Sequence, residues 1–349
     1  MSMPDARRSF PAVLPDLVWE AVLLFLALVV TGLGVAAGHF TPAHLAPRFA
    51  LLGLVAAGLA LSLRTGTPNL ALTGQVAVGQ LLYVVLVQHN LPGLVAGVLT
   101  VLIVLVMGVV LAVIAGLTGQ PGWAVTLAGL AACYAITLGA GTNMRVLPLA
   151  HLLTPGYFEV FSVLFVLGSL GGGALWLVPQ VRLFLSPEPE SGVGRRLVRA
   201  LVGIGGSSAL AGIAGALTAG YIGGSQVGLD LVTLLVALGA VLLGGISLAG
   251  RGGGVAGTVL GVYILAAFEF MALIHAWSLW AGTLLPATLA MLVGLPVAAL
   301  LDHFRARRDA TTSGTATGGP AAVPAAFPPP TAFPPPAFPP APGPVTPAR

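Results

Sequence analysis

The chain has 349 residues, of which 57% are hydrophobic and only 7% are charged. A soluble domain carries about 25% charged residues, so this composition excludes an ordinary soluble globular protein. All basic side chains other than histidine are arginines, because the chain has no lysine, and the net charge is only +4. Such a small net charge gives no basis for nucleic-acid binding. The sequence predicts an all-α, polytopic bundle of transmembrane helices in a lipid bilayer.

Apolar runs define the predicted membrane domain, residues 17–304, which follows a cytoplasmic segment at residues 1–16. A helix needs about 20 apolar residues to cross the hydrocarbon core. Ten runs approach that length: 17–38, 49–63, 69–88, 93–116, 123–139, 160–178, 201–221, 229–248, 255–274 and 284–301. The second, third, eighth and ninth runs are the weakest as complete spans, and some are expected to be broken or re-entrant.

Arginine placement predicts how the ten spans are oriented. One cluster precedes the first span, one fills the loop between the sixth and seventh, and one follows the tenth: Arg7 and Arg8; Arg182, Arg195, Arg196 and Arg199; Arg305, Arg307 and Arg308. Loops on the cytoplasmic side carry an excess of basic residues. An even number of spans puts all three clusters on that side, so both termini are expected in the cytoplasm of a cell (plasma) membrane protein.

The last part of the chain, residues 305–349, has a different composition. It is rich in Pro and Ala, with three consecutive prolines at 328–330 and again at 334–336. Proline at this density opposes helix and strand, and little apolar surface remains to form a core. We expect a disordered cytoplasmic tail that partly adopts polyproline II conformation.

A first informative patch lies at residues 64–80, RTGTPNLALTGQVAVGQ. Gly66 and Pro68 are expected to break the helix that ends at Arg64. Polar side chains then enter an otherwise apolar region: Asn69, Thr73, Gln75 and Gln80. Non-helical backbone at membrane depth is tolerated only where protein or a water-filled cavity covers it. Two interpretations stay open, because the amides either join helices or line a translocation path.

A second patch lies at residues 242–265, LLGGISLAGRGGGVAGTVLGVYIL. Two apolar runs flank a glycine hinge that contains Arg251. Beyond the hinge, Gly253, Gly257 and Gly261 recur every four residues and therefore share roughly one helix face. Small residues at this spacing let two membrane helices approach closely. The patch predicts a re-entrant or closely packed helical hairpin.

Both patches resemble signature motifs of permease subunits of monosaccharide-type ABC importers, in the superfamily of ribose-type and branched-chain amino-acid permeases. The first patch matches at Gly66, Asn69, Leu70, Gly74, Gln75 and Gly79. The second has the family's leucine-glycine-glycine, serine and glycine-rich turn, and residues 208–215, SALAGIAG, are a weaker match. The resemblance covers about residues 49–300.

The resemblance implies a permease domain that forms the translocation path for a monosaccharide or related sugar or nucleoside. It implies a homo- or heterodimer of permeases, cytoplasmic ABC ATPase subunits and an extracytoplasmic solute-binding protein. Helix-packing roles fall on glycines of the two patches: Gly66, Gly74, Gly79, Gly244, Gly245, Gly253, Gly257 and Gly261. Path-lining roles fall on the polar residues of the first patch and on Glu269.

One part of the chain departs from the family pattern. The family carries a short coupling helix before the segment that matches residues 208–215. Here the corresponding loop, residues 186–196, reads SPEPESGVGRR and is expected to have little helical character. Arg195 and Arg196 are our candidates for the contact with the ATPase.

No enzyme motif accompanies these patches. A P-loop requires a lysine that reaches the nucleotide phosphates, so the chain is expected to be a transport subunit without nucleotide binding, metal or cofactor. Glu269 lies inside the ninth run, and an ionisable residue in a span marks a candidate functional site. Three alternatives stay open: a branched-chain amino-acid permease, a proton-coupled secondary transporter that uses Glu269, and a degenerate structural subunit.

Overall fold

A computed structural model of the protein describes residues 10–36, 41–140, 145–147, 153–186, 192–225, 230–248, 250 and 254–314. The helices are α1 (Phe10–Ala36), α2 (Pro42–Arg64), α3 (Leu72–Gln88), α4 (Gly93–Thr118), α5 (Gly122–Gly139), α6 (Pro155–Leu177), α7 (Pro179–Leu185), α8 (Val193–Ala200), α9 (Gly206–Ile222), α10 (Leu231–Leu243), α11 (Gly257–Ile274) and α12 (Leu285–Gly314). Two π-helical turns precede α9 and α12: η3 (Leu201–Gly205) and η4 (Trp280–Leu284). Two short strands, β1 (Arg145–Val146) and β2 (Gly224–Ser225), pair antiparallel.

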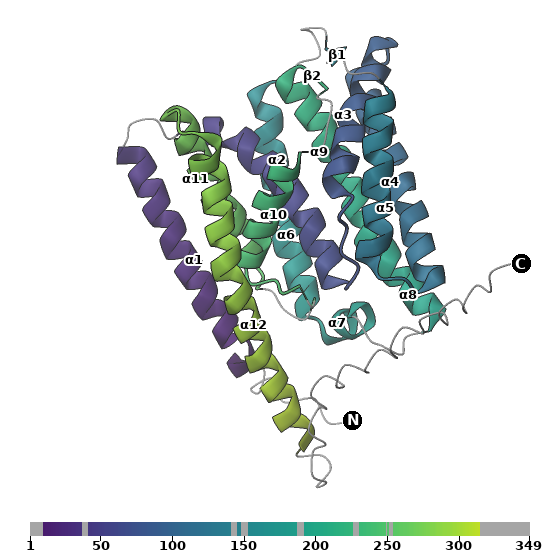
Figure 1. The fold of residues 1–349 in the computed structure, drawn as a ribbon. Helices are drawn as coiled ribbons and strands as arrows, with labels where there is room; N and C mark the ends of the chain where they lie inside the picture. The colour runs from purple at the N-terminus through teal and green to yellow at the C-terminus, as the bar shows by residue number, and fades with distance from the viewer. Residues whose placement is uncertain are drawn as a thin grey trace, which may run out of the picture. The chain divides into compact units, whose positions relative to one another are not determined.

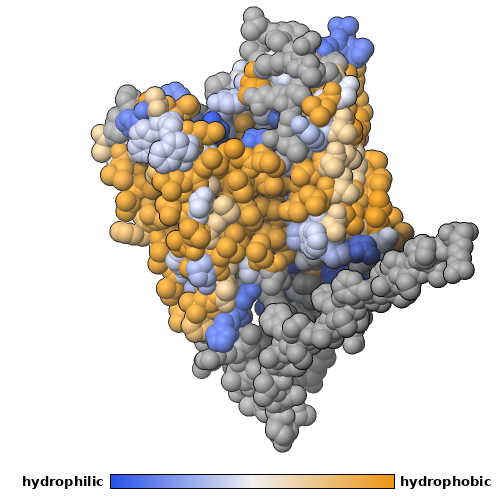
Figure 2. Space-filling view, viewed as in Figure 1, coloured by the Kyte–Doolittle hydropathy of each residue, from blue (hydrophilic) through white to orange (hydrophobic). Residues whose placement is uncertain are grey.

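The prediction of an all-α bundle is confirmed, and each of the ten apolar runs contains a helix. Within the described part of the chain, eight helical stretches are long and apolar enough to cross a membrane. The shorter apolar helices are α3 and α10, with 17 and 13 residues. On the face that Figure 2 shows, a broad apolar band crosses the helices, and hydrophilic residues gather toward its two edges. Such a band is the surface that a bilayer covers.

The helices run between two ends of the bundle, which we name the β end and the α8 end. The β end carries the β1–β2 pair, and the α8 end carries α7 and α8 (Figure 1). Helix α2 begins at the β end and finishes at the α8 end, where Thr65 and Thr67 contact Gly203 of η3. Helix α3 returns toward the β end.

Helix α9 occupies the centre and contacts α2, α3 and α4. Small residues permit these contacts. A Cβ atom added at Gly212 would lie 2.9 Å from the Cα atom of Val101 in α4, and one at Gly215 would lie 2.6 Å from the Val76 carbonyl oxygen in α3. Close backbone approach is how helices associate where lipid offers no hydrophobic driving force.

Three element boundaries differ from prediction. Helix α1 begins at Phe10, α2 at Pro42, and α12 continues to Gly314. Residues 305–314 were expected to belong to the disordered tail, and they are instead the last turns of α12. Apolar content marks only the membrane-embedded part of a helix, so polar turns beyond it were missed. The chain divides into residues 1–307 and 308–349, and only 308–314 of the second unit are described.

The expectation of little helical character before α9 is also wrong in part. Helix α8 begins at Val193 and contains both Arg195 and Arg196. The prolines and glutamates that argued against a helix are confined to residues 187–190, ahead of Gly192. The segment VGRRLVRA that follows has no helix breaker beyond one glycine, so it can form two turns.

Candidate functional site

Polar side chains meet in the bundle interior at the α8 end, in a cluster that we call the Asn69 network. Asn69 Nδ2 donates to Gln75 Oε1 at 3.1 Å and to Ser207 Oγ at 2.8 Å. Ser208 Oγ donates to the same Gln75 oxygen at 3.0 Å. All four side chains are fully buried. The network joins the segment before α3 to the start of α9.

The chain reaches this network because α2 ends in a tight turn. Gly66 adopts a φ of +68°, which a residue without a Cβ atom tolerates best. The Gly66 N–H bonds the Leu63 carbonyl and the Thr67 N–H bonds the Ser62 carbonyl, both at 2.9 Å. These two bonds form a Schellman motif, which satisfies the last carbonyls of a helix. The predicted break after Arg64 is therefore observed.

The start of α3 is capped by side chains. The side-chain oxygen of Asn69, Oδ1, accepts from the Ala71 N–H at 3.1 Å, and Thr126 Oγ1 of α5 accepts from the Leu70 N–H at 3.0 Å. Two polar groups of α3 remain without a partner among the described residues, the Thr73 hydroxyl and the Gln75 amide nitrogen. Buried donors of this kind are rare and call for a water molecule or a functional role.

A cavity of about 220 Å³, which we call the polar chamber, lies nearer the β end. Its polar lining comes from five helices or their caps: Arg48, Gln80, Thr218, Tyr221, Asp230, Thr233 and Glu269. Arg48 and Asp230 are exposed, Glu269 is half-buried and Gln80 is buried. The charged groups are therefore the more accessible ones. The chamber brings Gln80 and Glu269 together, two residues that lie far apart in sequence.

Sequence reasoning predicted only Gln80 and Glu269 of this polar lining, and the charged residues that it missed are Asp230 and Arg48. Asp230 caps α10, since its carboxylate accepts from the Thr233 N–H at 3.0 Å and from the Thr233 hydroxyl. Arg48 lies near the start of α2, at the end of the bundle opposite to α7 and α8. It belongs to none of the arginine clusters that oriented the spans, so nothing in the sequence directed attention to it.

A close contact between Gly79 of α3 and Gly215 of α9, which we call the neck, separates the polar chamber from the Asn69 network. A Cβ atom at Gly79 would lie 3.3 Å from the Gly215 Cα atom, so α3 and α9 nearly touch there. Gln75 and Gln80 lie on either side of this contact along α3, about 7.5 Å apart at 1.5 Å per residue. Gly74, in the same helix, is also buried. The two polar regions thus share α3 and α9.

The second patch forms a close-packed hairpin of α10 and α11. A Cβ atom at Gly257 would collide with the Gly244 carbonyl oxygen, and one at Gly261 with the Ala240 carbonyl oxygen. Gly245 has a φ of +83° and ends α10 in a second Schellman motif, with Ile246 N–H bonded to the Val241 carbonyl at 3.2 Å. Gly253 and Arg251 lie outside the described residues.

Two adjacent residues of α1 bind the two sides of the turn in this hairpin, the end of α10 and the start of α11. Trp19 Nε1 donates to the carbonyl of Leu243, the last residue of α10, at 2.7 Å. Glu20 Oε1 accepts from the N–H groups of Ala256 and Gly257 at 2.7 and 3.1 Å. A carboxylate at a helix N-terminus satisfies unpaired donors and complements the helix dipole. The sequence showed Glu20 near the start of a span, but not this partner.

The candidate ATPase contact lies beside α7. Arg195 Nε donates to the Phe184 carbonyl at 3.2 Å, and Arg199 Nη1 donates to the Ser186 carbonyl at 2.8 Å. Arg196 packs against Gly119, at the end of α4. Helices α7 and α8 thus form one connected element at the α8 end. Within the described residues, no group of three His, Cys, Asp or Glu side chains could hold a metal ion.

Comparisons with protein-family profiles, with curated proteins and with solved structures find no match to this chain.

Proposed function

We propose that the chain is the membrane-spanning permease subunit of an ABC importer and forms the translocation path for a small polar solute. The observation that carries the proposal is the arrangement of two polar regions on α3 and α9, with the Gly79–Gly215 neck between them. Transporters that work by alternating access hold a polar site near the bilayer middle and move helices around it. Separation of α3 from α9 at this neck would join the two regions.

The proposed path crosses a bundle of ten spans, in which α3 and α10 complete the eight longer helices. Their shorter length is compatible with this role, because the non-helical residues that follow α10, 244–247, and those that precede α3, 65–71, are buried or partly buried. Irregular backbone at membrane depth needs such protein cover. The motif resemblance of both patches supports the same assignment.

A monosaccharide or a related sugar or nucleoside is the solute class that we propose. The polar chamber offers one guanidinium, two carboxylates, one amide and several hydroxyls. Hydroxyl groups of a sugar both donate and accept hydrogen bonds, so they complement this mixed lining. In the proposed importer an extracytoplasmic binding protein would deliver the solute to the open side of the chamber.

The proposed orientation puts the α8 end in the cytoplasm, since the arginines of α7 and α8 lie there. Helices α7 and α8 would then face the ATPase subunits, and a second permease copy or a related permease would complete the dimer. Reporter fusions at Arg196 and after Arg308 should report the cytoplasm, and a fusion at His151 should report the outside. Termini on opposite faces would exclude ten spans.

The experiment that tests the function combines purification and transport. The full chain, extracted from its own membrane in detergent, should co-purify with an ABC ATPase. In proteoliposomes, uptake of a labelled monosaccharide should need that ATPase and ATP, and should persist when the proton gradient is collapsed. Uptake by the chain alone, driven by a pH gradient and lost in Glu269→Gln, would instead establish a secondary transporter.

Two variants separate coupling from assembly. Replacing Arg195 and Arg196 with glutamate should abolish the stimulated ATPase activity while the protein stays in the membrane. Replacement of the same two residues with lysine is the matched control, because it keeps both positive charges. An ATPase-bound complex that transports branched-chain amino acids and no sugar would favour that branch. A chain with no ATPase partner and no transport would favour a structural subunit.

A further inference from the structure

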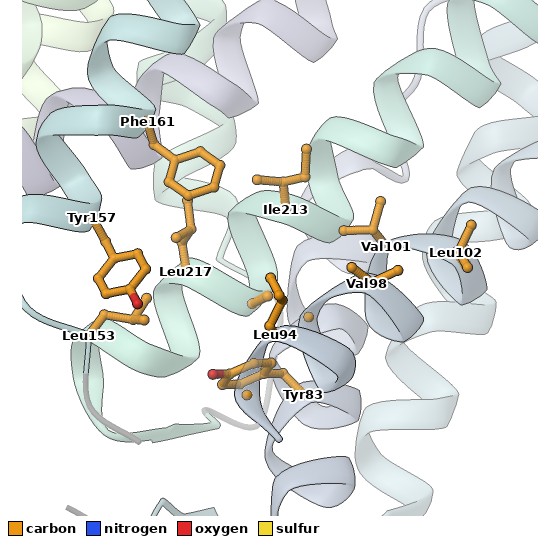
Figure 3. Close-up of a pocket in the computed structure, with 13 residues that line it drawn as sticks. Tyr83, Leu94, Val98, Val101, Leu102, Leu153, Tyr157, Phe161, Ile213 and Leu217 are labelled. Carbon is orange, nitrogen blue, oxygen red and sulfur yellow. The ribbon is translucent and has the colours of Figure 1, made fainter. Parts of the chain in front are cut away.

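Two further cavities border α6. One, of about 570 Å³, is a largely apolar pocket between α3, α4, α6 and α9, with the Tyr83 and Tyr157 rings in its wall (Figure 3). The other lies between α2, α6 and α9, and we call it the α6 groove. Its volume is about 220 Å³, and its walls include Leu54 and Leu61 of α2 and Leu210 of α9. Gly168 and Gly172 of α6 form its edge. A Cβ atom at either glycine would meet nothing within 4 Å, so the groove opens past α6 toward the lipid-facing surface.

One end of the α6 groove is polar. It is lined by Arg64, the last residue of α2, and by Trp176, near the end of α6. The guanidinium carbon of Arg64 lies 5.9 Å from the Trp176 ring centroid, a cation–π contact. Trp176 is only 7% exposed, and its indole N–H has no hydrogen-bond partner among the described residues. A buried donor without a partner points to an acceptor that binds there.

The polar end lies at the depth of lipid headgroups. Two candidate membrane spans, His44–Arg64 and Gly156–Leu177, end at or beside these residues. Trp and Arg are typical of this interfacial level. From Arg64 the groove extends back to Leu54, which is about 15 Å at 1.5 Å per residue. A charged site at headgroup level that continues as an apolar groove has the dimensions and polarity of a phospholipid.

We propose that the α6 groove binds an anionic phospholipid, with its phosphate at Arg64 and Trp176 and one acyl chain along the apolar walls. Basic pockets between membrane helices on the cytoplasmic side select acidic headgroups. The lipid site is separate from the polar chamber, which opens near the β end.

Native mass spectrometry of the full chain in neutral detergent tests this site. Titration with phosphatidylglycerol should show one lipid bound at least about tenfold more tightly than phosphatidylcholine, because both lipids carry the phosphate but choline brings a second cation close to Arg64. Inorganic phosphate at the same concentration should not displace it, because the acyl chain contributes binding. Trp176→Phe keeps the ring, removes the N–H donor to the phosphate and should weaken the binding of both lipids about tenfold.

Two glycine variants of α6 test whether the lipid binds in the groove. Gly172→Leu places a side chain at the groove edge and should reduce phosphatidylglycerol binding at least about tenfold. Gly171→Leu is the control, because Gly171 is equally exposed on α6 but does not line the groove. Equal affinity for the two lipids, or equal loss in the two variants, would overturn the site. A dimer that Gly172→Leu dissociates without any effect on lipid binding would assign the groove to a second copy.

Discussion

The molecule contains two helical hairpins whose turns lie at the same end of the bundle. The two hairpins are stabilised in different ways. In the first, α2 and α3 are joined by residues 65–71. In the second, α10 and α11 are joined by residues 244–256. Both first helices end in a Schellman motif with a left-handed glycine, at Gly66 and Gly245. The two turns are alike, but the contacts that stabilise the chain after each turn differ.

Side chains stabilise the first hairpin. Asn69 bonds α3 and α9, and Thr126 of α5 accepts from a backbone N–H ahead of α3. The polar groups come from the hairpin itself and from its neighbours in the bundle core. Such a network can exchange partners if the helices move, because hydroxyl and amide groups both donate and accept hydrogen bonds.

Backbone contact stabilises the second hairpin. Glycines bring α10 and α11 so close that no side chain fits between them, and α1 supplies the caps through Trp19 and Glu20. Backbone atoms in close contact cannot exchange hydrogen-bond partners as the side chains of the Asn69 network can. We therefore expect this hairpin to move as one unit with α1. If the proposed transport function holds, we expect the movement at α3 and α9 rather than within the α10–α11 pair.

The largest effect is expected at the backbone contact. Gly257→Leu would force α10 and α11 apart, since even a Cβ atom collides with the Gly244 carbonyl oxygen. We expect a loss of about 4 kcal/mol or more of stability and little monodisperse protein in detergent. Gly171→Leu, at an open position on α6, is the control for size-exclusion chromatography. Equal yields of the two variants would contradict close packing in the second hairpin.

The next effect is expected in the Asn69 network. Asn69→Ala removes two donors and leaves the Gln75 and Ser207 oxygens with fewer partners, which should cost about 2–3 kcal/mol. The measurement is the thermal melting temperature in detergent, with Gln120→Ala in an exposed turn as the control. A drop no larger than that of the control would show that the network contributes nothing to the first hairpin.

Sequence patterns predicted the elements of both hairpins better than their contacts. Apolar runs located α3 and α10 although each is short, and the four-residue glycine spacing predicted a close approach at Gly257. The partners of Glu20 could not be predicted, because Glu20 and Ala256 lie 236 positions apart. The polar chamber was missed for the same reason, because its charged and polar groups come from five elements that lie far apart along the chain.

A smaller effect is expected where α1 caps the second hairpin. Glu20→Ala leaves the N–H groups of Ala256 and Gly257 without their acceptor, and the loss of such a cap costs about 1–2 kcal/mol. Glu159→Ala, at an exposed acidic position on α6, is the control in the same thermal denaturation assay. If the two variants melt together, α1 does not stabilise the hairpin.

The smallest effect should be the same in both hairpins. Gly66→Ala and Gly245→Ala each put a Cβ atom on a left-handed residue, with φ values of +68° and +83°. This strain costs about 1 kcal/mol in each case. At Gly245 the nearest atoms to such a Cβ are the side-chain tips of Leu301, at 3.2 Å, and Trp19, at 3.6 Å, which can shift slightly. Equal small decreases in melting temperature would show that the hairpins share their turns and differ only beyond them. A much larger decrease for Gly245→Ala would mean that backbone packing already begins at the turn of the second hairpin.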